Sequence, residues 1–297
     1  MYLVTGATGF IGSHLYKRFE FNTAVASDFK VRSLAQWRDV PSLIHPEDIF
    51  VFLENAQNID AVFHLGAISS TTTVDTRKLA RWNILSSCKL LEWCVDHGVP
   101  FVYASSASVY GLGENGFQED VPLVPINYYA ISKVSFDMFA LQKMKDNPDA
   151  KIFGLRYFNV YGANEDHKGD MSSPVHKFVN QANETGEIRV FEDSENYIRD
   201  FVSVDDVVDI TLAAKDFEKS GIYNVGTGNP RSFLDVANII SDHTGAKIVE
   251  IPFPSHLVGK YQAFTKSDNT KLLNMCDHTF LTLEEGIARY VGGLEKG

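Results

Sequence analysis

The chain has 297 residues, of which 44% are hydrophobic and 22% are charged, a composition typical of a globular protein with a substantial buried core. No apolar run reaches the roughly 18 residues of a membrane span, and the formal net charge of −11 disfavours partners such as nucleic acid or anionic membranes. The three cysteines lack the spacing of a zinc site and are odd in number, so we expect a cytoplasmic protein with neither a disulfide framework nor a bound metal.

Short apolar or β-branched runs alternate with longer helical patterns from the N-terminus onward. The runs predict strands at 2–5, 23–28, 60–65, 99–104, 151–157 and 222–225. The helical patterns predict helices at 11–20, 47–57, 77–97, 129–145 and 205–215. Strands that alternate with helices form parallel sheets covered on both faces, so we expect a doubly wound α/β fold of the Rossmann type.

The order of elements changes after about residue 158. The stretch 163–200 is polar and contains glycine, and the C-terminal part mixes short elements with Pro230, Pro252 and Pro254. We therefore predict a dinucleotide-binding domain and a smaller, interleaved C-terminal substrate lobe. The domain comprises 1–158 and about 201–228, and the lobe comprises about 159–200 and 229–297.

A glycine-rich turn joins the first predicted strand to the first predicted helix. In it, Gly6 permits a tight turn, Gly9 lets backbone amides approach a pyrophosphate, and Gly12 lets the helix pack close to the strand. The helix N-terminus favours an anion, so this turn predicts a dinucleotide site. Asp28, at the end of the second strand, suits the ribose hydroxyls of NAD. Lys30 and Arg32 follow at once and suit the 2′-phosphate of NADP, so the spacing leaves both cofactors open.

A second set of residues suits the oxidation of an alcohol. Tyr129 and Lys133 lie four residues apart on one face of a predicted helix, and Ser106 follows the fourth predicted strand. We expect the ammonium to lower the pKa of the phenol, so that Tyr129 exchanges a proton with a substrate oxygen that Ser106 binds.

These residues resemble the extended short-chain dehydrogenase/reductase family, over nearly the whole chain. Residues 60–67 are similar to the family's strand and turn beneath the cofactor, and 156–162, 199–206 and 224–228 are similar to its sugar-nucleotide branch. The resemblance implies cofactor contacts through Phe10, Ile11, Asp28, Phe29, Gly66, Ala67, Ile68, Ser69, Asn83, Lys133 and Val160.

A closer resemblance is to the branch of this family that inverts C6 of ADP-heptoses for lipopolysaccharide synthesis. It is carried by 69–72, 167–169, 191–201, 251–254 and 260–265. It implies NADP as cofactor, with NAD also possible, an ADP-sugar as substrate, and Lys168 as a second acid/base beside Ser106, Tyr129 and Lys133. We also expect a homo-oligomer. The implied substrate contacts are Ser106, Asn159, Asp170, Lys177, Phe191, Glu192, Asp193, Ser194, Arg199 and Tyr261.

Three positions depart from that pattern. Asp170 stands where the branch has a serine, Lys177 where it has a histidine, and Asp193 where it has a glycine. These departures affect the identity of the sugar more than the type of reaction.

Alternatives remain at this stage. Lys168 could be a phosphate-binding charge, and a UDP-sugar 4-epimerase shares the cofactor turn and triad but needs only one tyrosine because its whole sugar ring turns over. A 4,6-dehydratase carries an Asp-Glu pair where this chain has Ala107 and Ser108. A non-catalytic NAD(P)-sensing regulator on the same fold tends to lose the Tyr/Lys pair, which is present here.

Overall fold

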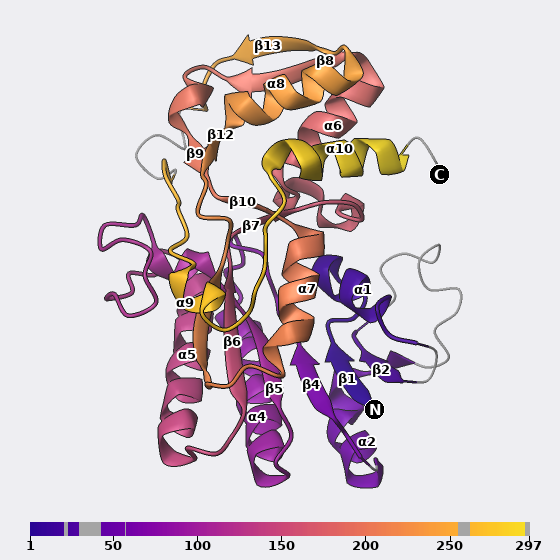
Figure 1. Ribbon diagram of the computed structural model, residues 1–297, viewed down its shortest axis with the longest axis vertical. Coiled ribbons are helices and arrows are strands. Elements are labelled where there is room, and N and C mark those ends of the chain that lie inside the picture. The colour runs from indigo at the N-terminus through magenta and orange to yellow at the C-terminus, as the bar shows by residue number, and fades with distance from the viewer. Residues whose placement is uncertain (21–22, 30–42, 57, 255–261, 295–297) are drawn as a thin grey trace.

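The computed structural model describes residues 1–20, 23–29, 43–56, 58–254 and 262–294. In Figure 1 the strands of the central sheet run upward through the lower part of the molecule, and a smaller group of helices and short strands lies above their upper ends. No helix in these ranges combines the length and the apolar character needed to cross a membrane.

Within the described residues, the central sheet has seven parallel strands: β1 (Tyr2–Thr5), β2 (Ala24–Ser27), β3 (Leu43–Ile44), β4 (Ala61–His64), β5 (Phe101–Ser106), β6 (Ile152–Tyr157) and β11 (Gly221–Val225). Their spatial order is β11-β6-β5-β4-β1-β2-β3. The chain adds β2 and β3 on one side of β1 and the later strands on the other side, so the order of the strands reverses between β1 and β4. This arrangement confirms the predicted doubly wound α/β fold. Such sheets bind ligands outside the carboxyl ends of their strands, at the reversal.

Helices cover both faces of the sheet. α1 (Phe10–Tyr16) and α7 (Val204–Ala214) pack on one face, and α2 (Ile49–Asn55), α4 (Ser86–Asp96) and α5 (Tyr128–Asp146) pack on the other. The predicted helices at 11–20, 47–57, 129–145 and 205–215 correspond to α1, α2, α5 and α7. The predicted helix 77–97 is instead divided into α3 (Thr76–Leu79), a π-helical stretch (Ala80–Leu85) and α4.

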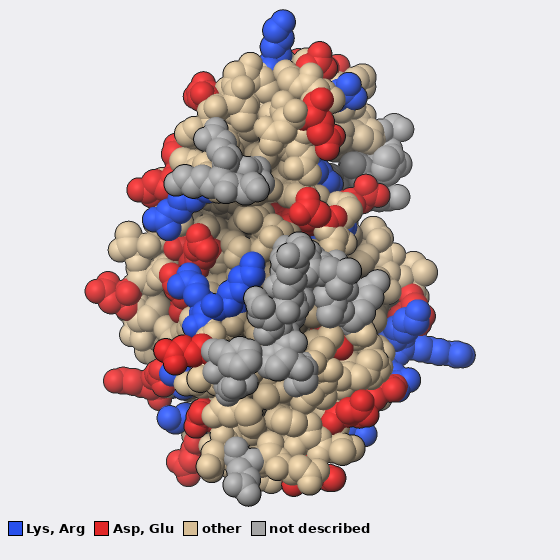
Figure 2. All heavy atoms as spheres, turned by 90° about the vertical axis from the view of Figure 1, so that its right-hand side faces the viewer, with Lys and Arg blue, Asp and Glu red and all other residues tan. Residues whose placement is uncertain are grey.

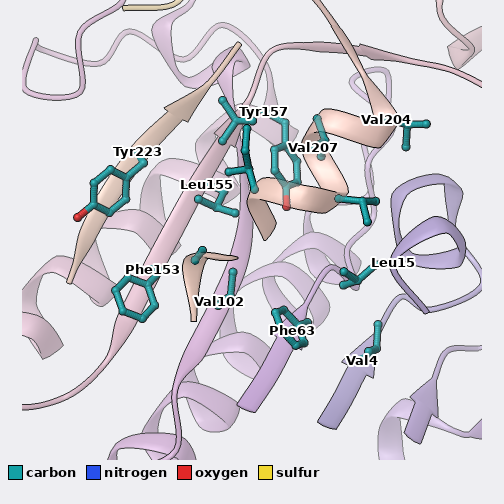
Figure 3. Packing of buried hydrophobic residues seen from close by; sticks show 14 of the residues in the cluster. Val4, Leu15, Phe63, Val102, Phe153, Leu155, Tyr157, Val204, Val207 and Tyr223 are labelled. Carbon is teal, nitrogen blue, oxygen red and sulfur yellow. The ribbon is translucent and has the colours of Figure 1, made fainter. Parts of the chain in front are cut away.

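Each face of the sheet has its own hydrophobic core, because neighbouring residues of a strand point to opposite faces. Figure 3 shows Val4 and Phe63 in the core beneath α7, where Val204 also lies. Leu3 and Val62, the preceding residues of the same strands, belong to the core on the opposite face. Strands buried on both faces read as nearly continuous apolar runs, which is why these strands could be located from the sequence.

After β6 the chain leaves the sheet, returns and leaves again. The first excursion contains β7 (Asn159–Tyr161), α6 (Pro174–Thr185), β8 (Glu187–Phe191) and β9 (Ile198–Arg199), and β10 (Phe201–Ser203) leads back through α7 to β11. The second contains β12 (Arg231–Ser232), α8 (Phe233–Thr244) and β13 (Lys247–Ile251). α9 (Thr270–Leu273) then lies against β11, and α10 (Leu283–Leu294) packs on α8.

Helices α6, α8 and α10 were not among the predicted elements. They form a separate hydrophobic core in the upper part of the molecule, where Val175 and Phe178 of α6 cluster with Val236 and Ile240 of α8 and with Ile287 of α10. β10 pairs with β7 within the first excursion, whereas β13 pairs with β8 and β12 with β9 across the two excursions. The upper part is therefore built from segments that are distant in the sequence.

Candidate active site

A cavity of about 630 Å³ opens at the carboxyl ends of β1, β4 and β5. Figure 2 shows that the surface is hollowed between the lower and upper parts of the molecule, with Lys and Arg side chains at the edge of the hollow. Of the site residues predicted from the sequence, the cavity is lined by Gly6, Gly9, Phe10, Ile11, Gly12, Asp28, Phe29, Gly66, Ala67, Ile68, Ser69, Ser106, Tyr129, Lys133, Val160 and Lys168.

The other predicted site residues fall into three groups. Lys30, Arg32 and Tyr261 fall outside the described residues. Asn83 is buried behind the cavity wall. Within the described part of the chain, the remaining predicted substrate residues are not in the lining of this cavity: Asn159, Asp170, Lys177, Phe191, Glu192, Asp193, Ser194 and Arg199.

The glycine turn after β1 is shaped by close backbone contacts. Gly6 has a φ of +66°, and a Cβ at this position would lie 2.6 Å from the amide nitrogen of Gly66. A Cβ at Gly12 would overlap the carbonyl oxygen of Gly6. Gly9, the residue before α1, contributes no capping side chain, so the first amides of the helix are left for a ligand. The turn therefore fits the pyrophosphate of a dinucleotide.

Asp28 is held rigidly at the end of β2. Its Oδ2 accepts hydrogen bonds from the amide and the hydroxyl of Thr8, at 3.1 and 2.7 Å, and its Oδ1 accepts one from the amide of Phe29 at 2.7 Å. The ring of Phe29 meets the ring of Trp82 edge-on, with centroids 4.6 Å apart. Pro46, Ile49, Phe50 and Trp82 also line this end of the cavity and were not singled out from the sequence.

A buried histidine supports the loop after β4. The Nδ1 of His64 lies 2.7 Å from the hydroxyl of Thr5, which also accepts a hydrogen bond from the amide of Gly66 at 3.1 Å. The Nε2 of His64 lies 2.7 Å from the hydroxyl of Ser87. Burial lowers the pKa of His64 to about 3, with a further contribution from the charge of Lys133, so the ring is neutral and joins β1, β4 and α4.

Asn83 fixes the same loop from behind. Its Oδ1 accepts a hydrogen bond from the amide of Ile68 at 2.8 Å, and its Nδ2 donates to the carbonyl of Ile68 and the hydroxyl of Ser132, both at 3.0 Å. Asn83 lies in the π-helical stretch, a conformation that often occurs at functional sites. It acts on the cavity by holding the 66–69 loop against α5.

Ser106, Tyr129 and Lys133 meet at the centre of the cavity. Tyr129 and Lys133 lie in the first two turns of α5, which begins where the side chain of Asn127 accepts a hydrogen bond from the amide of Ala130. The ammonium of Lys133 donates to the carbonyl of Ala104 at 2.8 Å and lies 5.9 Å from the centre of the Tyr129 ring.

The pKa values of these groups differ in part from the expectation. Burial lowers the pKa of Lys133 to about 8, although the charge of Asp137 opposes this change. Burial raises the pKa of Tyr129, and a hydrogen bond with Ser106 opposes it. The expected net lowering of the tyrosine pKa by the ammonium is therefore wrong for this structure, because removal of the phenol from water outweighs its favourable contacts.

A buried ion pair lies beneath the triad. Nε of Arg156 on β6 lies 3.0 Å from Oδ2 of Asp137, and the hydroxyl of Tyr103 donates to Oδ1 at 3.1 Å. Asp137 follows Lys133 by one further helical turn on α5. Sequence reasoning missed this residue, although its position four residues after Lys133 placed it on the same helix face.

Lys168 borders the cavity from the segment that follows β7. Its Nζ lies 2.5 Å from Oε2 of Glu165 and 4.6 Å from the centre of the Phe10 ring. Its side chain is 24% exposed, whereas that of Glu165 is 0% exposed. Glu165 was not predicted from the sequence, because no local pattern shows which group a single carboxylate will pair with in the folded protein.

Several of the predicted substrate residues that do not line the cavity form smaller groups elsewhere. The ammonium of Lys177 donates to the carbonyl of Asp170 at 2.7 Å, and Nδ2 of Asn159 donates to the hydroxyl of Thr265 at 3.1 Å. Arg199 is buried with its guanidinium 5.6 Å from the centre of the Phe233 ring.

The turn at Phe191, Glu192, Asp193 and Ser194 contains a left-handed residue, Asp193, whose φ is +60°. That conformation explains why glycine suits this position in the branch that the sequence resembles, and aspartate is one of the residues that tolerate it.

Comparison with known proteins agrees with this geometry. A family model described as the NAD dependent epimerase/dehydratase family matches residues 2–226. ADP-L-glycero-D-manno-heptose-6-epimerase of Alkalilimnicola ehrlichii is 42% identical over 312 residues, which cover 98% of this chain and 96% of that protein.

Two solved structures resemble the whole chain. The ADP-L-glycero-D-manno-heptose-6-epimerase of Helicobacter pylori has a TM-score of 0.86 and 29% identity, covering 99% of this chain and 96% of that one. The UDP-glucose 4-epimerase of Thermotoga maritima has a TM-score of 0.84 and 29% identity, covering 99% and 98%. With the family model matching most of its length, this chain belongs to the NAD dependent epimerase/dehydratase family.

Proposed function

We propose that this protein is an isomerase that inverts C6 of ADP-glycero-manno-heptose in the synthesis of lipopolysaccharide core precursors. The main observation that supports this proposal is that one cavity is lined by two groups able to transfer a proton, Tyr129 on α5 and Lys168 in the segment after β7. Inversion exposes both faces of one carbon, and two proton-transfer groups from different elements suit that task. The relatives named as heptose 6-epimerases support this choice of substrate.

Most of the cavity residues have roles in holding a dinucleotide. The amides at the start of α1 would bind its pyrophosphate and Asp28 its adenosine ribose. Val160 and the 66–69 loop, with Asn83 behind it, would complete the wall. When bound, the nicotinamide would accept a hydride from C6 of the sugar and later return it, leaving a 6-keto sugar in between. We propose NADP rather than NAD, because Lys30 and Arg32 follow Asp28 and suit a 2′-phosphate.

The chain's own residues would handle the proton. Ser106 would bind the C6 oxygen, and Tyr129 would remove its proton as the hydride leaves. Lys133, whose ammonium is held by the Ala104 carbonyl, would stabilise the phenolate. After the terminal part of the sugar turns, Lys168 would donate a proton to the same oxygen on the opposite face.

We assign substrate binding to the upper part of the molecule, over about 159–200 and 229–297. There Asn159, Asp170, Lys177 and Arg199, with the 191–194 turn and Tyr261, would contact the ADP-sugar. We also propose a homo-oligomer. The supporting observation is that α5 exposes Ile131, Met138 and Leu141, whose spacing of seven and ten residues from Ile131 places them along one side of the helix.

The rival is a UDP-sugar 4-epimerase, since the Thermotoga maritima structure matches about as closely as the Helicobacter pylori one. The deciding experiment incubates the protein with ADP-heptose and with UDP-sugars in separate reactions and identifies the epimers. We expect C6 inversion of ADP-heptose only. Lys168→Met should abolish it while the fold and cofactor binding persist, and Lys89→Met, a change of an exposed lysine on α4, should not. Equal epimerisation by Lys168→Met and wild type would favour the 4-epimerase.

A further inference from the structure

The proton donor proposed above is paired with a carboxylate that has no assigned role. Glu165 is fully buried, and its Oε2 lies 2.5 Å from the ammonium of Lys168. We propose that Glu165 is a positioning residue that holds the ammonium of Lys168 at the wall of the cavity. This inference rests on the proposed function, because it has a catalytic consequence only if Lys168 transfers a proton.

Groups other than Lys168 also donate hydrogen bonds to the carboxylate of Glu165. Its Oε1 accepts hydrogen bonds from the hydroxyl of Ser173 at 2.6 Å and the amide of Gly162 at 3.3 Å, and its Oε2 accepts one from the amide of Ser173 at 2.8 Å. Ser173 is also the cap of α6, where its hydroxyl accepts a hydrogen bond from the amide of His176. A carboxylate at the N-terminus of a helix of this length is stabilised by the free amides there.

Two contacts restrain the ammonium of Lys168. The carboxylate of Glu165 accepts a hydrogen bond from one of its N–H groups, and the centre of the Phe10 ring lies 4.6 Å from its Nζ. Among the described residues, its other two N–H groups have no hydrogen-bond partner in the protein, and Lys168 itself lines the cavity. Phe10 is the first residue of α1, so the ammonium of the proposed proton donor packs against the ring of the first residue of the helix assigned to the cofactor.

The proton balance of the reaction defines what the carboxylate does. In the second half of the reaction, an N–H bond of Lys168 breaks and an O–H bond forms at the C6 oxygen as the hydride returns to C6. Lys168 becomes a neutral amine, while Tyr129 holds the proton that it removed in the first half. Exchange with water then restores both groups. By holding the ammonium through its carboxylate, Glu165 keeps Lys168 in place as the acid before the sugar turns.

Other titratable groups lie near this pair. The imidazole Nε2 of His176 lies 3.6 Å from the carboxylate of Asp166, and its Nδ1 lies 2.6 Å from the hydroxyl of Tyr290 on α10. The charges of Glu165 and Asp166 help burial to raise the pKa of Tyr290. His14 on α1, which contacts the carbonyl of Ala163, and His167, which lines the cavity, are further titratable groups in this region.

The test compares Glu165→Gln with the wild type in C6 epimerisation. Losing the anion removes the charged partner that restrains the ammonium of Lys168. We expect kcat to fall by about 100-fold, as a displacement of about 1 Å can produce, with KM changed by less than about threefold. A purely structural role would lower the amount of folded protein and leave kcat per folded molecule unchanged.

Two control variants separate the charge from the fold. Ser232→Ala removes the side-chain cap of α8, a helix away from the pair, so it should lower Tm and keep kcat within about twofold. Glu165→Asp keeps the charge but withdraws the carboxylate by one methylene, so kcat should fall with KM little changed. If Glu165→Gln does not fold, Glu165→Asp decides, and a wild-type kcat there overturns the proposal.

A measurement without turnover completes the test. Acetic anhydride reacts faster with amines that are not held in ion pairs, so the rate of Lys168 acetylation, followed by mass spectrometry, should rise in Glu165→Gln, where Lys168 has lost its partner, relative to that of Lys89 in the same sample. Lys168→Met separates the role of Lys168 from that of Glu165. If Lys168→Met is inactive while Glu165→Gln keeps the wild-type rate, the proposed function stands and the role of Glu165 is refuted. If Lys168→Met is fully active, both fail.

Discussion

Lys133→Met should stabilise the protein at neutral pH while it abolishes turnover. Burial lowers the pKa of Lys133 from 10.5 to about 8, and each unit corresponds to about 1.4 kcal/mol, so holding this ammonium inside the protein opposes folding by about 3 kcal/mol at pH 7. Methionine fills a similar volume without a charge. It leaves the Ala104 carbonyl without its hydrogen-bond donor, and this loss cancels about 1 kcal/mol of the gain in stability. Asp137 keeps its ion pair with Arg156 at 3.0 Å.

The sign of the pH dependence provides the sharper test. Between about pH 8 and 10.5 the unfolded chain binds a proton at Lys133 that the native protein has lost, so wild-type stability should rise with pH across this window. Lys133→Met lacks that rise. We therefore expect the variant to be more stable by about 1–2 kcal/mol near pH 7, with the advantage shrinking as pH approaches 10.

Urea unfolding followed by circular dichroism at about pH 7 and about pH 9.5 measures both quantities. Lys89→Met, at an exposed position, is the control and should change stability by less than about 0.5 kcal/mol at either pH. A variant less stable than the wild type at pH 7, or one that keeps the same pH dependence, would refute the reasoning about the buried charge. Turnover by Lys133→Met would separately remove the lysine from the catalytic group.

Three further outcomes are expected. Tyr129→Phe should lose nearly all epimerase activity, by at least about 100-fold, with an unchanged circular dichroism spectrum, and a wild-type rate in folded protein would remove the tyrosine from the mechanism. NADP should bind more tightly than NAD in fluorescence titrations of cofactor-free protein, and Lys30→Ala with Arg32→Ala should remove the difference; tighter NAD binding in the wild type would contradict the NADP proposal. Gly12→Ala should destabilise the protein by about 1–3 kcal/mol or more in urea unfolding, because the new methyl group would overlap the Gly6 carbonyl; unchanged stability and cofactor affinity would show that the turn can relax.

The predicted strands of the sheet were found because each is a short apolar or β-branched run. The helices of the upper part carry a comparable signal that the sequence analysis did not use. In α8, Phe233, Val236, Ala237 and Ile240 form an apolar stripe, with Ser232 as its cap and Gly245 after its end. The nearby prolines favoured an irregular segment, but they lie outside the helix, where they interrupt nothing.

Strands such as β9 and β12 are only two residues long and cannot be found by periodicity. The residues that line the cavity come from motifs that are local in the sequence, and these placed Ser106, Tyr129 and Lys133 in one site. The partners behind them depend on contacts between distant segments, as with Asp137 and Arg156, and only the fold shows these. The roles assigned to the site residues stay predictions until the variants are measured.

The order of strands has a consequence for synthesis of the chain. β11 pairs with β6, yet residues 158–220 separate the two strands in the sequence. Until the ribosome has made that segment, β6 is the outer strand of an incomplete sheet, with unpaired amides and carbonyls along its free side. At about 5–20 residues per second this state lasts on the order of 3–13 seconds. An exposed strand edge of apolar sequence can pair with another chain, so during the interval before β11 arrives the nascent protein presents an edge at which it can aggregate.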